Sequence, residues 1–177
     1  MTTTDKALSI LGGKKLLAQG ARHGRKVAPA RRGSARRGAV GLEEGAVPVP
    51  LGIEPGEVRW VEIIRSGLPS ESLERTAGKL KLSVNDLSLR LGLPPRTVHR
   101  RVQKGERLTP DETEKNVRAA RALAKAQQVL GDDDGRLWLL EPSRALGGEV
   151  PITLLDTADG FTAVMDELGR LEYGVVS

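Results

Sequence analysis

The sequence predicts an all-α fold in which a helix-turn-helix domain is followed by a smaller helical domain and preceded by a disordered basic arm. Three observations lead to this prediction. Aromatic residues make up only 2% of the 177 residues, so the core must consist of Leu, Val, Ile and Ala, which favours helices packed by aliphatic ridges over a deep ligand pocket. From about residue 57 onward, apolar residues recur at helical spacing between capping residues. Positive charge is concentrated at the N-terminus.

The basic arm is predicted over residues 1–50. Residues 1–42 contain ten Lys or Arg and a single acid, Asp5, a net charge of +9, whereas the whole chain carries +5. Between Gly20 and Gly45 there is almost nothing to bury, and such a segment cannot offset the entropy of folding. The arm either lies along DNA phosphates, which would make binding salt-dependent, or is a solvated low-complexity leader or the product of a start codon placed too far upstream.

The composition argues against an enzyme, a metalloprotein and a membrane protein. The chain has no cysteine, and its two histidines, His23 and His99, lie far apart in sequence, which is a poor basis for a metal site or a catalytic triad. We therefore expect no catalytic residue, no metal and no cofactor. No apolar run reaches about 18 residues and no secretion signal is recognisable. Together with the lack of cysteine, this favours a cytoplasmic location.

Two short support helices are predicted before the helix-turn-helix. The first covers residues 57–65 and ends at Gly67 and Pro69, because these two residues break a helix. The second begins at Ser70, which has the residue type of an N-cap, and runs to Leu80. Both have apolar residues at intervals of three and four, which predicts one buried face for each helix.

The helix-turn-helix itself is the strongest local pattern in the chain. Ser83 and Asp86 have the spacing of an N-cap and its third helical residue, and Gly92 is suited to a left-handed stop. A second helix begins directly after it, at Pro94 and Pro95, and runs to Gly105. Two short helices joined by a tight glycine turn are typical of a helix-turn-helix.

The second of these helices has the composition of a recognition helix. Val98 and Val102 should point inward, and the residues that should point elsewhere are basic, or small and polar. Such side chains meet base edges and phosphates in the major groove. The alternative is a solvated basic face on an ordinary pair of helices. The candidate DNA-binding residues are Arg96, Thr97, His99, Arg100 and Lys104.

A longer helix is predicted from Thr109, with Pro110 at its first position and Glu112 at its third, to about Leu130. The acidic run Asp132–Asp134 that follows lacks the distal Glu of a calcium-binding loop. We interpret it as a solvated helix cap.

The C-terminal third is predicted as short helices that end on an apolar terminus. Residues 135–140 form a first helix with Leu137, Trp138 and Leu140 together, Pro151 opens a second, and a last helix begins near Ala158. The chain then closes with Leu, Tyr and Val residues, whereas termini are usually polar and frayed. These residues either fold back on their own domain, form a homodimer contact or are received by a second protein.

At this point the sequence resembles the MbcA/ParS/Xre antitoxin family, over roughly residues 57–177. The upstream part is similar to the Xre-like helix-turn-helix of that family, and the C-terminal part to its toxin-binding domain. Thr113 and Lys115 stand where the family commonly has Ser and Arg, and the basic arm is not part of the shared pattern. The residues that carry the resemblance are Arg96–Arg101, Glu112–Lys115, Arg118, Trp138–Leu139, Pro142, Ala145–Gly148, Pro151–Thr157, Gly160 and Leu168–Val175.

The resemblance implies a partner, a RES-domain toxin that consumes NAD, and inhibition by packing over its cofactor cleft. Trp138 and Tyr173 are aromatic types that anchor interfaces, and Glu172 or the terminal carboxylate could pair with cations that would otherwise hold the NAD phosphates. The candidate toxin-binding residues are Trp138, Leu171, Glu172, Tyr173, Gly174, Val175, Val176 and Ser177.

The sequence therefore predicts three regions: the arm (1–50), a helix-turn-helix domain for DNA binding and dimerisation (51–130), and a toxin-binding domain (131–177). The preferred function is an antitoxin that also represses its own operon, acting as a homodimer on operator DNA within a hetero-oligomeric complex with the toxin. The alternative is a stand-alone transcriptional regulator whose C-terminal domain dimerises or binds another partner. A membrane partner is not expected.

Overall fold

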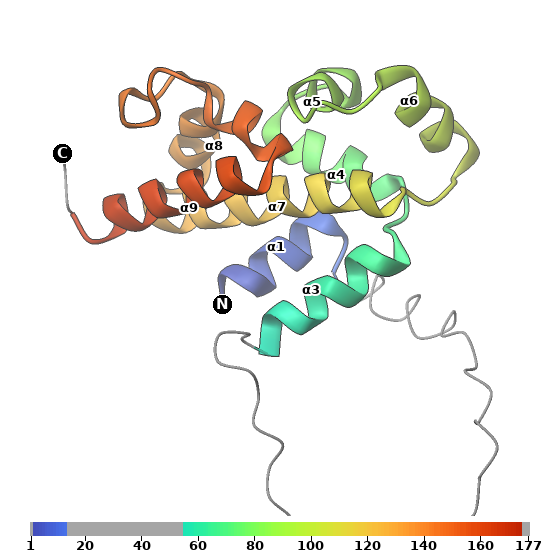
Figure 1. The fold of residues 1–177 in the computed structure, drawn as a ribbon, viewed down its shortest axis with the longest axis horizontal. Coiled ribbons are helices and arrows are strands. Elements are labelled where there is room, and N and C mark those ends of the chain that lie inside the picture. The colour runs from blue at the N-terminus through green and yellow to red at the C-terminus, as the bar shows by residue number, and fades with distance from the viewer. Residues whose placement is uncertain (1, 14–54, 175–177) are drawn as a thin grey trace, which may run out of the picture.

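The computed structural model describes residues 2–13 and 55–174, and these form the all-α fold that the sequence predicts (Figure 1). Apart from an isolated bridge between Pro69 and Arg107, the described residues contain no β-structure. None of their helices is both long enough and apolar enough to cross a membrane. The helices are α1 (Thr3–Leu11), α3 (Pro55–Ser66), α4 (Glu71–Leu80), α5 (Val84–Arg90), α6 (Pro95–Lys104), α7 (Pro110–Leu130), α8 (Asp132–Leu140), the 3-10 turns η1 (Arg144–Leu146) and η2 (Pro151–Asp156), and α9 (Ala158–Glu172).

The longest of these helices, α7, forms the centre of the fold. Its start is fixed by a reciprocal cap, as predicted: the Thr109 side chain accepts a hydrogen bond from the Glu112 amide (3.2 Å), and the Glu112 carboxylate accepts one from the Thr109 amide (2.8 Å). Alanines are buried along the helix, and their small size lets other helices approach it closely. They are Ala119, Ala120, Ala122, Ala124 and Ala126.

The helices α1, α3, α4, α8 and α9 all pack against α7. In the view of Figure 1, α1 and α3 lie below α7, α9 runs along it, and α8 and α4 lie above it. α5 and α6 extend the α4 side and form the helix-turn-helix. The buried side chains from both ends of the molecule join one continuous hydrophobic core.

The N-terminal helix α1 corrects the prediction of a flexible arm that begins at residue 1. The Thr2 side chain accepts a hydrogen bond from the Asp5 amide (3.2 Å), and the Asp5 carboxylate accepts one from the Thr2 amide (3.3 Å). The apolar face of α1 packs against α7 and α4 and buries four residues, Ala7, Leu8, Ile10 and Leu11. The rest of the predicted arm, residues 14–50, lies outside the described residues.

Two local predictions, one about α8 and one about the start of α4, also need correction. In α8 the buried side chain is Leu139, whereas Leu137 is 40% exposed. The acidic residues Asp132 to Asp134 are exposed at a helix end, as predicted, and form the first turn of α8, where negative charge is favourable against the helix dipole. Ser70 precedes α4 as predicted, yet its side chain makes no cap bond and instead donates to the Arg101 carbonyl (3.4 Å).

Candidate nucleic-acid interface and C-terminal surface

The helix-turn-helix is built as its local sequence predicts. The Ser83 side chain accepts a hydrogen bond from the Asp86 amide (3.0 Å) and starts α5. Gly92 has φ +60°, a left-handed conformation that turns the chain into α6 without strain. Leu87, Leu91 and Val98 are fully buried between the two helices and the core. The orientation of α6 is therefore set by packing on the rest of the domain.

The turn at Gly92 also rests on the C-terminal part of the chain. The Lys115 ammonium donates to the Gly92 carbonyl (3.4 Å). A Cβ atom at Gly92 would lie 3.7 Å from the Asp156 Cβ atom in η2. Arg118 fixes η2 to α7, because its guanidinium donates to the Asp156 carbonyl (3.0 Å). Gly92 is thus held between α7 and η2.

The outer face of α6 carries the predicted DNA-binding residues. Arg96, His99, Arg100 and Lys104 are exposed and Thr97 is half-buried. Within the described residues, none of the three cations in this set forms an ion pair.

Arg101, the remaining basic residue of α6, differs from this set because it is paired with Glu106 (3.6 Å) and with the buried Glu112 (3.3 Å). Arg101 therefore supports the domain, while the unpaired cations are free to meet phosphates or bases.

Gln103 belongs to the same exposed face and was not predicted from the sequence. Its amide nitrogen lies 2.9 Å from the Nε2 atom of His99, one turn earlier in α6. The signal that could have identified it is its spacing: Gln103 follows Arg96 by seven residues and His99 by four, which places all three on one side of a helix.

The predicted toxin-binding residues lie on α8 and on the end of α9. Tyr173 is 81% exposed, Gly174 is exposed and Leu171 is half-buried. Trp138 is half-buried and packs against the core. Val175, Val176 and Ser177 lie outside the described residues.

Glu172 differs from its exposed neighbours because contacts within the chain hold it. Its carboxylate accepts from Lys125 (2.6 Å) and from Gln128 (3.4 Å), both on α7. These bonds attach the C-terminal end of α9 to α7 immediately before Tyr173. The backbone there is anchored while the tyrosine ring remains accessible.

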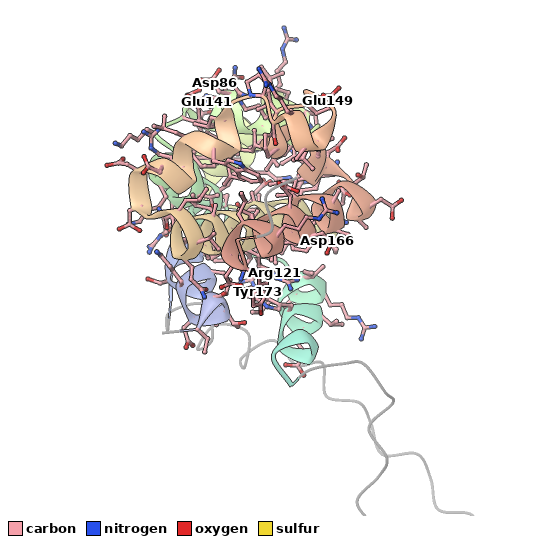
Figure 2. The ribbon with its side chains drawn as sticks, turned by 90° about the vertical axis from the view of Figure 1, so that its left-hand side faces the viewer. Asp86, Arg121, Glu141, Glu149, Asp166 and Tyr173 are labelled. Carbon is pink, nitrogen blue, oxygen red and sulfur yellow. The ribbon has the colours of Figure 1, made fainter. Side chains whose placement is uncertain are left out.

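Arg121, in the middle of α7, contacts one aromatic ring in α3 and one in α9. Its guanidinium lies 5.9 Å from the centre of the Trp60 ring in α3 and 5.1 Å from that of the Phe161 ring in α9. Both distances are in the range of cation–π attraction. Figure 2 shows Arg121 and Tyr173 in the lower part of the folded region, and Asp86, Glu141 and Glu149 at its top.

This geometry defines a class: a helix-turn-helix protein with an unpaired basic face, fused to a second helical unit that presents an exposed aromatic end. Comparison with known families supports both parts of this description. Residues 59–121 match the antitoxin Xre-like helix-turn-helix domain, and residues 125–174 match the antitoxin Xre/MbcA/ParS C-terminal toxin-binding domain.

The chain is also similar to curated antitoxins. It is 39% identical over 88 residues to an antitoxin Xre of Yersinia enterocolitica, a match that covers 49% of this chain and 60% of the relative. It is 29% identical over 117 residues to an antitoxin Xre of Photorhabdus laumondii, with 65% and 79% covered. A Prs ADP-ribosylating antitoxin of Sphingobium is 26% identical over 124 residues, with 64% and 78% covered.

The chain therefore belongs to the Xre/MbcA/ParS antitoxin family. This membership confirms the predicted family and the prediction that the protein is not an enzyme. α1, which packs against α4 and α7, lies outside both matched regions.

Proposed function

We propose that the chain is the antitoxin of a type II module, that it inhibits an NAD-consuming RES-domain toxin by covering its active site, and that it represses its own operon. The observation that carries this proposal is the match of residues 125–174 to a toxin-binding domain. The name of the Sphingobium relative refers to ADP-ribosylation, a reaction that consumes NAD, which supports a partner of this chemistry. We expect the complex to form in the cytoplasm.

The C-terminal surface supplies what occlusion of an active site requires. Inhibition of this kind needs a shape and an anchor rather than catalytic groups, and exposed aromatic side chains are common anchors at interfaces. Tyr173 is 81% exposed on a helix end that Lys125 and Gln128 hold in place. We assign the toxin-binding role to residues 131–177, with Trp138 and the segment from Leu171 to Ser177 as contacts.

DNA binding is assigned to the outer face of α6. Arg96, Thr97, His99, Arg100 and Lys104 supply cations and hydrogen-bond donors for phosphates and base edges. One recognition helix makes too few base contacts for useful specificity, so we propose that the chain binds a palindromic operator as a homodimer. The dimer would then carry a toxin on each copy within a larger complex.

The toxin assignment is tested by expressing the adjacent gene in bacteria, alone and with this protein, and by measuring growth and NAD level. Full-length protein should preserve both. A truncation after Arg170 and the milder Tyr173→Ala should fail to do so, while Arg96→Ala, on the opposite functional surface, should protect as well as the wild type. If the adjacent gene is harmless alone, the chain is better explained as a stand-alone regulator.

The DNA assignment is tested by binding to the upstream region of the operon. Arg96→Ala or Arg100→Ala should cost ~1–3 kcal/mol of operator affinity if the side chain reads a base, and neither should change protection against the toxin. If both substitutions leave the operator affinity unchanged, α6 is not part of the DNA interface. Loss of both activities in the same variant would contradict the division of labour between the two surfaces.

A further inference from the structure

The outer face of α6 contains a polar pair whose role the family match does not assign. Gln103 and His99 are both exposed and are four residues apart, and the Gln103 amide nitrogen lies 2.9 Å from His99 Nε2. An amide nitrogen can only donate, so the ring nitrogen that it meets must accept. In this arrangement the Nε2 atom of His99 is the acceptor and the Gln103 amide is the donor.

The bond to His99 changes what Gln103 can present to a ligand. A free, exposed glutamine samples many rotamers, and ordering one on binding costs free energy. Here the histidine ring has already restricted the amide. One of its two N–H groups is used by His99, and the other N–H and the Oε1 carbonyl oxygen remain available. Gln103 thus presents one donor and one acceptor side by side, in a restricted orientation.

This pattern is complementary to one base edge in the major groove. Adenine presents its N7 atom as acceptor and its N6 amino group as donor, and glutamine pairs with both at once. Arg96 and Arg100 lie seven and three residues before Gln103 on the same exposed side of α6, and arginine can only donate. Among these neighbours, Gln103 is the side chain with the combination that adenine requires.

We propose that Gln103 is a specificity-determining residue that reads an adenine in the operator, and that His99 is the residue that positions it. The inference rests on the proposed DNA-binding function of α6. It adds a base identity and a residue that the matched helix-turn-helix family does not supply. The two side chains act as a unit, so removal of His99 weakens the same base preference that removal of Gln103 abolishes.

The test is selection of binding sites from a random DNA library by the full-length protein, followed by affinity measurements on the selected site. Wild-type protein should select adenine at one position of each half-site. Gln103→Ala should lose that preference by ~5- to 150-fold and retain the preferences at the other positions. An unchanged selection profile for Gln103→Ala would overturn the proposal.

Substitutions of His99 test the positioning role. His99→Leu should weaken the adenine preference at the same position, whereas His99→Asn, which keeps an acceptor within reach of the amide, should restore part of it. Equal profiles for His99→Leu and wild type would show that Gln103 acts without its partner. Both residues are exposed, so these substitutions should not change the thermal stability. A melting curve of each variant checks that it folds.

Failure of this inference can be distinguished from failure of the proposed function. If wild-type protein selects no sequence and Arg100→Ala does not change its affinity for DNA, then α6 is not a DNA-reading helix and both ideas fail. If the wild type selects a site that depends on Arg100 but not on Gln103, only the assignment of Gln103 is wrong.

Discussion

Gly135 is a position where two α-helices of the C-terminal half, α7 and α8, approach each other closely, and its replacement by alanine tests this packing. Gly135 is buried in α8 and faces the backbone of α7. An added Cβ atom would lie 2.5 Å from both the carbonyl carbon and the oxygen of Ala126, and 2.6 Å from the Gln127 amide nitrogen. These are backbone atoms, so no side-chain rotation can relieve the clash.

The expected cost follows from this geometry. α8 would have to move by about 0.9 Å to restore a contact of 3.4 Å, and overpacking of a tight core costs ~1–3 kcal/mol. The backbone contact at Gly135 puts it at the upper end of that range. Alanine is a better helix former than glycine by ~1 kcal/mol, which offsets part of the cost. The net destabilisation is ~2 kcal/mol, or a fall in Tm of roughly 8 °C for a domain of this size.

The assay is a thermal melt followed by circular dichroism at 222 nm, with Gly169→Ala as the matched control. Gly169 is also within a helix that packs on α7, but nothing lies within 4 Å of a Cβ atom added there. Gly169→Ala should therefore keep or raise the Tm, because only the propensity gain applies. A Gly135→Ala protein that melts at or above the wild-type temperature would refute the close approach of α8 to α7.

Three further predictions concern other contacts. Leu11→Ala should lower the free energy of unfolding by ~2–5 kcal/mol, since Leu11 is 1% exposed; an unchanged urea midpoint would mean that α1 is not docked. The hydrogen bond from Lys81 holds the pKa of Asp133 below 3.8. The stabilisation that the ionised Asp133 carboxylate contributes is present above its pKa in the unfolded chain and is lost as pH falls through its lower pKa in the folded protein. Lys81→Ala should raise the pKa of Asp133 in a carboxyl NMR titration. Tyr173→Ala should weaken toxin binding by at least ~2 kcal/mol in calorimetry if Tyr173 is an anchor, with no change in Tm.

The helix-turn-helix could be predicted because its signals are local. Ser83 with Asp86, and Thr109 with Glu112, each form within four residues the cap that their spacing indicates. Gly92 has the positive φ that a tight turn requires. In such cases both partners of a hydrogen bond lie in the same short stretch of sequence, so the sequence of that stretch is enough to predict the contact.

The features that sequence reasoning missed depend on partners far along the chain. α1 is only nine residues long, and a helix of that length is marginal alone. It forms because α4 and α7, which begin only at Glu71 and Pro110, pack against the face that contains Leu8 and Leu11. Likewise, the phase of α8 is set by the contact of Gly135 with α7, which turns Leu139 rather than Leu137 inward.

The proposed DNA-binding surface on α6 and the proposed toxin-binding surface at the end of α9 belong to different helices, yet these helices are built on one core. Both family matches include part of α7, so the end of that helix at Leu130 does not divide two independent cores. The turn that leads into α6 rests on Lys115 of α7 and lies beside Asp156 of η2, and η2 is bonded to α7 through Arg118. Any toxin contact that displaced η2 would therefore also act on the turn at Gly92. Because coupling between two binding sites is reciprocal, the factor by which bound toxin changed operator affinity would equal the factor by which bound operator changed toxin affinity.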